Sequence, residues 1–393
     1  MSGALAALML AERGCAVDLY DAAATPLAGA SRNCEGKIHL GFVYGLDPSL
    51  RTVRRLLRGA LTFRPILARY VEAATLDKAL SDPFLYAVPT SSMLAPAAVE
   101  AHFARVGEAV DDLAGEVGRA YPGLDATAFW EPLARPEREA LFDGASIAAC
   151  YTTAERAFDP APLADSLAAT LAATPGIRLV LGTRVSDVVP ADGGGYRITA
   201  QDRDGERQAT YTHVVNATWQ ERLALDRAVL GVPRRPVIHR YKVGFRTRLE
   251  HGAPPPTVTF VSGAYGDIVH YDGTVYASWY PVGLLRQERA LAPERPPPDP
   301  AAEATLLADT LAGLGGFTAD GGRWADGAGP WQPLGGYITS WGESGIEDPS
   351  SELHERHDIG PHGTASYQSI DTGKFTTAPL FAQMATQRIL GLA

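Results

Sequence analysis

The first 21 residues constrain the fold more than any other stretch of the chain. Residues 2–14 meet no helix breaker before Gly14 and are mostly small or apolar, which predicts a helix. Residues 15–20 predict a short strand, and Asp21 follows it. Helix, turn, strand and acid form the second half of a dinucleotide-binding βαβ unit, whose helix N-terminus faces a pyrophosphate and whose acid binds a ribose hydroxyl. The 18-residue distance from Gly3 to Asp21 agrees with that unit.

The first half of such a unit is a buried strand followed by the pattern G-x-G-x-x-G. Gly3 stands where the last of these glycines is expected, so the strand and the other glycines would precede Met1. We therefore expect Met1 to be an internal residue of a longer natural protein, or a misassigned start. Taken alone, the stretch is equally compatible with an ordinary amphipathic N-terminal helix followed by a strand.

Length and composition exclude several classes of protein. With 393 residues, 46% of them hydrophobic and 20% charged, the chain is long enough for two or more cores. Its 35 basic and 45 acidic residues give a net charge of −10 without charged blocks, which argues against nucleic acid as a partner. Three scattered cysteines, Cys15, Cys34 and Cys150, suit a reducing cytoplasm. No apolar run reaches the ~20 residues that span a bilayer.

The rest of the chain predicts interleaved helices and strands. Helices are expected over 48–80 with an interruption at Pro65, and over 96–121, 161–173, 301–314 and 380–391. Strands are expected over 84–90, 145–151, 177–181, 184–189, 196–201, 208–217, 237–246, 257–262, 267–271 and 275–280. The turn Tyr271-Asp272-Gly273 predicts a tight hairpin, a connection is expected near Trp130, and 320–372 is predicted to be mostly loop.

Residues 31–44 are too rich in glycine and polar side chains for a regular element, and too apolar for a surface linker. We expect a partly buried loop whose backbone is satisfied by a bound cofactor. Two further motifs follow in the chain, Val214-Val215-Asn216-Ala217-Thr218 and Gly373-Lys374-Phe375-Thr376-Thr377.

Together with the N-terminal helix, strand and acid, these motifs resemble the FAD-dependent D-amino acid oxidase superfamily over nearly the whole chain. Ile38-His39-x-Gly41-x-x-Tyr44 is similar to a loop of its glycerol-3-phosphate and L-2-hydroxyglutarate dehydrogenase branches, and Gly-Lys-x-Thr-Thr is similar to the first of these. Two positions depart from the pattern. Trp219 replaces the glycine after Thr218, and Val43 replaces an arginine of the glycerol-3-phosphate branch, which argues against phosphate recognition of that kind.

The resemblance implies FAD as the cofactor and assigns residues to it. Gly3 would approach the pyrophosphate and Asp21 the ribose, while the backbone of Val185 would meet the adenine unless 184–189 belong to a plain β-meander. Loop 31–44 would wrap the flavin ring, and Lys374 would face its O2 edge, unless it is a surface lysine. The full set of expected cofactor residues is Gly3, Asp21, Ser31, Arg32, Asn33, Gly36, His39, Gly41, Val185, Ala217, Thr218, Gly373, Lys374, Phe375 and Thr376.

The expected catalytic residues lie on the same loop and on the strands of 237–280. His39 is a candidate general base, with a structural hydrogen-bond role as the alternative. Alternation along 237–246 places Arg240 and Lys242 on one face. Arg240, Tyr271 and Tyr280 would bind a small carboxylate, the alternative being a solvated charged face. His354, His357 and His362 lack the spacing of a metal site, and no metal is expected.

We therefore predict an α/β fold: a Rossmann-like FAD domain lacking its first strand, and an α+β substrate domain built on an antiparallel sheet. The FAD domain is expected over 1–83, 145–225 and 335–393, and the substrate domain over 84–144 and 226–334. The predicted reaction is hydride transfer to FAD from a C–H next to an amine, with oxygen or another carrier reoxidising the flavin. One alternative is a 2-hydroxy acid dehydrogenase or oxidase, and another is a truncated, flavin-less protein without catalysis.

Overall fold

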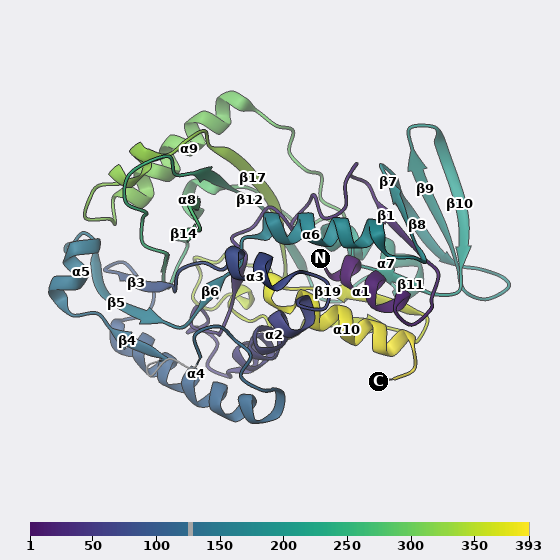
Figure 1. Ribbon diagram of the computed structural model, residues 1–393, viewed down its shortest axis with the longest axis horizontal. Coiled ribbons are helices and arrows are strands. Elements are labelled where there is room, and N and C mark those ends of the chain that lie inside the picture. The colour runs from purple at the N-terminus through teal and green to yellow at the C-terminus, as the bar shows by residue number, and fades with distance from the viewer. Residues whose placement is uncertain (125–128, 393) are drawn as a thin grey trace.

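The computed structural model describes residues 1–124 and 129–392, and Figure 1 shows its elements. Two pairs of parallel strands are formed by segments that lie far apart in the chain. Strand β1 (Val17–Asp21) pairs in parallel with β7 (Ile177–Leu181), and β11 (Val214–Asn216) with β19 (Tyr367–Asp371). β18 (Gly360–Gly363) adds an antiparallel edge to β19. Parallel pairing with intervening helices confirms the α/β class of the prediction.

Helix α1 (Ser2–Ala11) packs against β1 and β11, and helix α10 (Ala378–Ile389) packs against α1. Most of α1 is buried, including Ser2 and residues 4–10, because small and apolar side chains surround it on all sides. A Cβ on Gly3 would lie 3.0 Å from the Ala217 Cβ. The glycine therefore permits the close approach of the helix to the end of β11.

A nine-stranded mixed sheet forms the other large unit. Its pairs are antiparallel, except that β13 runs parallel to β3. The strands are β3 (Leu85–Pro89), β4 (Trp130–Pro132), β5 (Ile147–Thr153), β12 (Val237–Arg248), β13 (Val258–Phe260), β14 (Gly266–Tyr271), β15 (Thr274–Trp279), β16 (Leu284–Glu288) and β17 (Gln332–Trp341).

The remaining elements surround these sheets (Figure 1). Strands β8 (Arg184–Pro190), β9 (Tyr196–Asp202) and β10 (Gly205–Tyr211) form an antiparallel sheet that projects at one end of the molecule, and β2 (Lys37–Ile38) pairs with β6 (Arg156–Ala157). The helices are α2 (Arg51–Leu67), α3 (Ala73–Ala79), α4 (Pro96–Val117), α5 (Arg135–Leu141), α6 (Pro160–Ala173), α7 (Arg222–Leu230), α8 (Tyr280–Gly283) and α9 (Pro300–Gly315).

Most predicted elements are confirmed, including the hairpin at 271–273, where Gly273 has φ +77°. The prediction of a mostly irregular segment over 320–372 is wrong, because β17, β18 and β19 lie there. Two glycines concealed β17: a Cβ on Gly335 would lie 2.0 Å from the Tyr241 hydroxyl, so this strand uses glycine to admit a neighbouring ring.

Smaller corrections concern element boundaries. The predicted strand 208–217 is two strands, β10 and β11, which belong to different sheets. Residues near Trp130 form the edge strand β4 rather than a connection, and helix α5 was not predicted. Pro65 lies inside the last turn of α2 instead of interrupting a longer helix.

Candidate active site

The loop at 36–44 meets the C-terminal loop 373–377 in the interior. The His39 backbone N–H donates to Thr376 Oγ1 over 3.0 Å, and Thr376 Oγ1 donates to the Lys37 carbonyl over 3.1 Å. Thr376 is fully buried. Two segments that the sequence places more than 300 residues apart are thus joined where the resemblance predicted the flavin ring.

His39 is buried, and neither of its ring nitrogens has a hydrogen-bond partner. Its Nδ1 lies 3.6 Å from Glu155 Oε1, which also accepts a hydrogen bond from the Tyr86 hydroxyl. Glu155 Oε2 accepts a hydrogen bond from the Leu40 N–H at 2.6 Å. Burial lowers the pKa of His39, so the imidazole is neutral at pH 7. Burial opposes ionisation of Glu155, but His39, Lys37 and Tyr86 together lower its pKa.

Two buried arginines lie on the other side of the site. Arg240 donates to the Tyr280 hydroxyl at 2.8 Å and to Ser340 Oγ at 3.2 Å, and Arg356 donates to the Thr339 carbonyl at 2.8 Å. Their exposed fractions are 2% and 5%. Burial and then the charge of Arg240 lower the pKa of Arg356 to about 10. Among the described residues, no carboxylate lies within ion-pair distance of either guanidinium.

A third cation stands at the C-terminal loop. Burial and then the charge of Arg356 lower the pKa of Lys374 to about 8. Gly373 before it has φ +64°, and the Phe375 ring lies 5.4 Å from the Phe63 ring. Lys374 is partly buried between these two residues, and its expected contact with the flavin stays a prediction.

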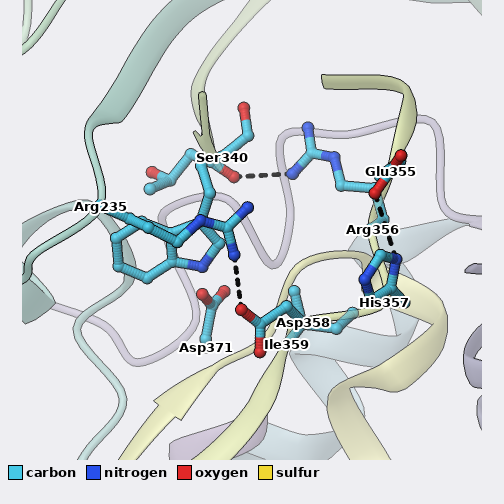
Figure 2. A pocket seen from close by; sticks show the side chains of 10 residues that line it. Arg235, Ser340, Glu355, Arg356, His357, Asp358, Ile359 and Asp371 are labelled. Atoms are coloured by element: carbon cyan, nitrogen blue, oxygen red, sulfur yellow. Dashed lines mark hydrogen bonds and ion pairs between the residues drawn. The ribbon is translucent and has the colours of Figure 1, made fainter. Parts of the chain in front are cut away.

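Arg356, but not Arg240, borders a small groove near the surface. Figure 2 shows Ser340 and Arg356 in its wall, with the ion pair between Arg235 and Asp358 across it. An adjoining groove of about 400 Å³ shares Arg235, Trp341 and Asp358. The Arg235 guanidinium lies 5.7 Å from the centre of the Trp341 ring. Arg356 therefore lies beside the grooves that Arg235, Trp341 and Asp358 share.

Several functional candidates were missed from the sequence. Lys37 Nζ forms an ion pair with Asp267 at 2.7 Å and lies 4.2 Å from the centre of the Phe84 ring. Glu155 gave no signal because its partner His39 is 116 residues away. Arg356 lay in a segment predicted to be irregular. Strand alternation had already placed Lys242 on one face with Arg240, although no functional role was assigned to it.

The expected adenosine and pyrophosphate residues occupy different environments. Asp21 is partly buried at the end of β1, where burial raises its pKa and the Ala23 N–H donates to it at 2.9 Å. Ser31 accepts a hydrogen bond from the Met1 amine, and Asn33 donates to the Gly335 carbonyl at 3.2 Å. Arg32 instead pairs with Asp165 near the surface. Val185 lies in β8, opposite Ala200 of β9.

Two glycines of loop 31–44 adopt backbone conformations that other residues rarely adopt. Gly36 has φ +64° and Gly41 has φ +114°. A Cβ on Gly36 would lie 1.9 Å from the Phe158 carbonyl oxygen, so no other residue fits there without movement. Tyr271 donates its hydroxyl proton to the Glu35 carbonyl, so its hydroxyl contacts this loop rather than Arg240.

Trp219 stands where the resemblance predicts a glycine, and its backbone conformation is one that glycine favours. Its φ is +59°, in the left-handed region that glycine favours. Its indole Nε1 donates to the Tyr337 carbonyl at 2.7 Å, which holds the ring against the nine-stranded sheet. Thr218 before it is fixed through hydrogen bonds from its N–H and hydroxyl to Asn216 Oδ1.

The arrangement fits FAD on several independent features. Gly3 opens α1 against Ala217, as a pyrophosphate cradle requires, and Asp21 ends β1. Polar atoms of His39, Tyr44 and Arg240 are buried without a hydrogen-bond partner. Such atoms are rare in folded proteins and mark a place where a ligand supplies the partner.

Comparisons with known proteins agree with this geometry. Residues 1–387 match the family DAO, described as FAD dependent oxidoreductase. The fold is similar to glycine oxidase from Geobacillus kaustophilus (TM-score 0.69, 16% identity, 99% of this chain and 92% of that one). It is also similar to iminodiacetate oxidase from Chelativorans sp. BNC1 (0.63, 13%, 99% and 93%). A third similar structure is L-α-glycerophosphate oxidase from Mycoplasma pneumoniae with FAD bound (0.62, 11%, 99% and 93%). No curated protein sequence matches the chain.

The described part of the chain contains neither a helix suited to cross a membrane nor a cluster of metal ligands. Over residues 1–124 and 129–392, no helix is both long and apolar enough to cross a membrane. In the same part of the chain, no three histidine, cysteine, aspartate or glutamate side chains gather as a metal site would require. His354 Nε2 instead contacts the Asp348 carbonyl at 2.9 Å.

Proposed function

Because the chain belongs to the DAO family of FAD-dependent oxidoreductases, we propose that it oxidises a small amino acid or amine that carries a carboxylate. Family membership sets aside the flavin-less interpretation and leaves the substrate to be identified. The two interpretations that remain differ in the atom next to the oxidised carbon, which is nitrogen in an amine and oxygen in a 2-hydroxy acid.

The pair of buried arginines is the observation that carries this proposal. The guanidinium groups of Arg240 and Arg356 carry positive charge and are buried without an acidic partner at ion-pair distance among the described residues. Burying an unpaired charge is costly, so such a pair is stable only where an anion binds. A guanidinium binds a carboxylate through two parallel hydrogen bonds, and the Tyr280 hydroxyl lies beside Arg240 to orient it.

The proposed reaction removes a hydride from the substrate carbon and a proton from its nitrogen. When bound, FAD supplies the two-electron acceptor for that hydride. The product is an imine, which water hydrolyses to a carbonyl compound and ammonia, or an amine where the nitrogen carries a substituent. The protein's own share is to bind the carboxylate through Arg240 and Arg356 and to keep water from the reacting carbon through the buried loops 36–44 and 373–377.

His39 favours the hydroxy acid alternative. A hydroxyl must lose its proton as the hydride leaves, and a neutral imidazole accepts a proton at pH 7. Glu155 stands 3.6 Å behind the ring and stabilises the imidazolium that would form. An amine substrate needs such a base less, since a neutral amine keeps its proton until after hydride loss.

Anaerobic mixing of the FAD-loaded protein with amino acids and with 2-hydroxy acids separates these interpretations. Bleaching of the flavin by amino acids alone supports the first, and bleaching by 2-hydroxy acids alone supports the second. Failure of both classes would overturn the proposal. Arg240→Gln is expected to raise KM about 10- to 100-fold, as loss of a charge-assisted hydrogen bond predicts. The matched control Arg54→Gln removes an exposed arginine paired with Asp112 and should leave KM unchanged.

We also propose a division of the chain into two domains and a cellular location for the protein. The nine-stranded sheet draws mainly on 84–144 and 226–334, which supports a substrate domain over these ranges, with β5 and β17 contributed from their borders. Limited proteolysis would locate the boundaries. The free thiols of Cys15, Cys34 and Cys150 support a reducing, cytoplasmic location, which cell fractionation would test.

A further inference from the structure

Lys242 is a second cationic position on the strand that carries Arg240. The two residues are separated by one position on β12, so their side chains leave the same face of the sheet about 7 Å apart. The Tyr280 ring lies beside both: its centre is 6.0 Å from Arg240 Cζ and 5.4 Å from Lys242 Nζ. Two positively charged side chains therefore lie beside the Tyr280 ring on this face of the sheet.

Lys242 is also without an acidic partner at ion-pair distance among the described residues. Its Nζ donates one hydrogen bond, to Ser278 Oγ at 3.1 Å. An ammonium group has three donors, so two are left for a ligand. The nearest acid on the same sheet, Asp267, already pairs with Lys37 at 2.7 Å and accepts a hydrogen bond from Thr259 at 2.6 Å.

We propose that the substrate is a dicarboxylate whose first carboxylate binds Arg240 and Arg356 and whose second binds Lys242. This inference rests on the proposed function and narrows its substrate class. Two cations that leave one face of β12 two positions apart suit a molecule with two carboxylates, such as succinate or glutarate. Lys242 is accordingly a specificity-determining residue. A phosphate is disfavoured as the second anion because one ammonium and one hydroxyl offer few donors to its three oxygens.

Isothermal titration calorimetry on the FAD-loaded protein tests the inference without knowledge of the substrate. The probes are propionate, succinate, glutarate and glycerol phosphate. We expect succinate or glutarate to bind about 10- to 100-fold tighter than propionate, as one added charge-assisted contact predicts. Lys242→Met should abolish that preference while the Kd of propionate stays within about 2-fold, and Lys242→Arg should retain part of it.

Thermal unfolding of each variant shows whether it is folded, and Arg54→Gln controls for the loss of one positive charge. Equal affinity for mono- and dicarboxylates in the native protein would overturn the inference and leave the proposed function standing. So would an equal loss of both affinities in Lys242→Met, or glycerol phosphate binding tighter than either dicarboxylate. Binding of no carboxylate at all would overturn the inference and the proposed function together.

Discussion

At the scale of single residues, the site is defined by charges held away from water. After burial, the charges of Arg356 and Arg240 lower the pKa of Lys374, and the charge of Arg240 lowers the pKa of Arg356. A bound anion reverses this repulsion. The affinity of the protein for a carboxylate should therefore report the protonation of Lys374.

Carboxylate affinity should fall as pH rises through about 8, the pKa to which burial and Arg356 lower Lys374. Below that pH the lysine is charged and assists binding; above it the assistance is lost. Titration of propionate between pH 6 and 10 measures the change. Lys374→Gln should bind more weakly at pH 7 and show a flat profile over this range. A native profile with no step would contradict the prediction.

If the substrate is a 2-hydroxy acid, the pH dependence of catalysis should report His39. A base acts when deprotonated, so kcat/KM should rise with pH through a value below 6.5, because burial lowers the pKa of His39. Glu155→Gln removes the charge that raises this pKa, and the acid limb should move to lower pH. If the acid limb of the kcat/KM profile is unchanged in Glu155→Gln, a group other than His39 controls it.

At the scale of elements, the loop 31–44 depends on backbone conformations that few side chains permit. Gly36→Ala places a Cβ 1.9 Å from the Phe158 carbonyl in a residue with φ +64°. We expect a loss of about 1–3 kcal/mol in the free energy of unfolding and weaker retention of FAD. Chemical denaturation and the flavin-to-protein absorbance ratio measure the two effects.

Gly29→Ala is the matched control, since its Cβ would meet no atom within 4 Å. It should leave both quantities unchanged. If the two variants behave alike, the loop tolerates a side chain at position 36, and glycine is not required there.

At the scale of the whole molecule, one buried ion pair ties the cofactor loop to the nine-stranded sheet. Burial opposes the charge of Asp267, but Lys37 and then Lys242 lower its pKa. Because the folded pKa lies below the unfolded one, the pair stabilises the protein above the ordinary value of 3.8 and loses this effect as pH falls further. The two units should therefore separate in acid.

Asp267→Asn leaves Lys37 buried without its partner, and we expect it to cost about 3–5 kcal/mol at pH 7. Its stability should fall less steeply than that of the native protein below pH 3.8. Urea denaturation over a series of pH values measures both effects. Asp112→Asn, at an exposed pair with Arg54, should cost about 0–1 kcal/mol. Equal costs for the two variants would refute a special role of the buried pair.

The sequence by itself predicted the fold class through local periodicity and glycines, which leave their pattern in neighbouring residues. The resemblance of its motifs to a known superfamily gave the FAD family, which the family match confirms. The sequence also placed Arg240 and Lys242 on one face through strand alternation. Only the tertiary structure decided which distant groups became partners: Glu155 behind His39, Asp267 beside Lys37, and Arg356 near Arg240. The physical reason is that burial and charge pairing depend on distances between chain segments, which no local pattern encodes.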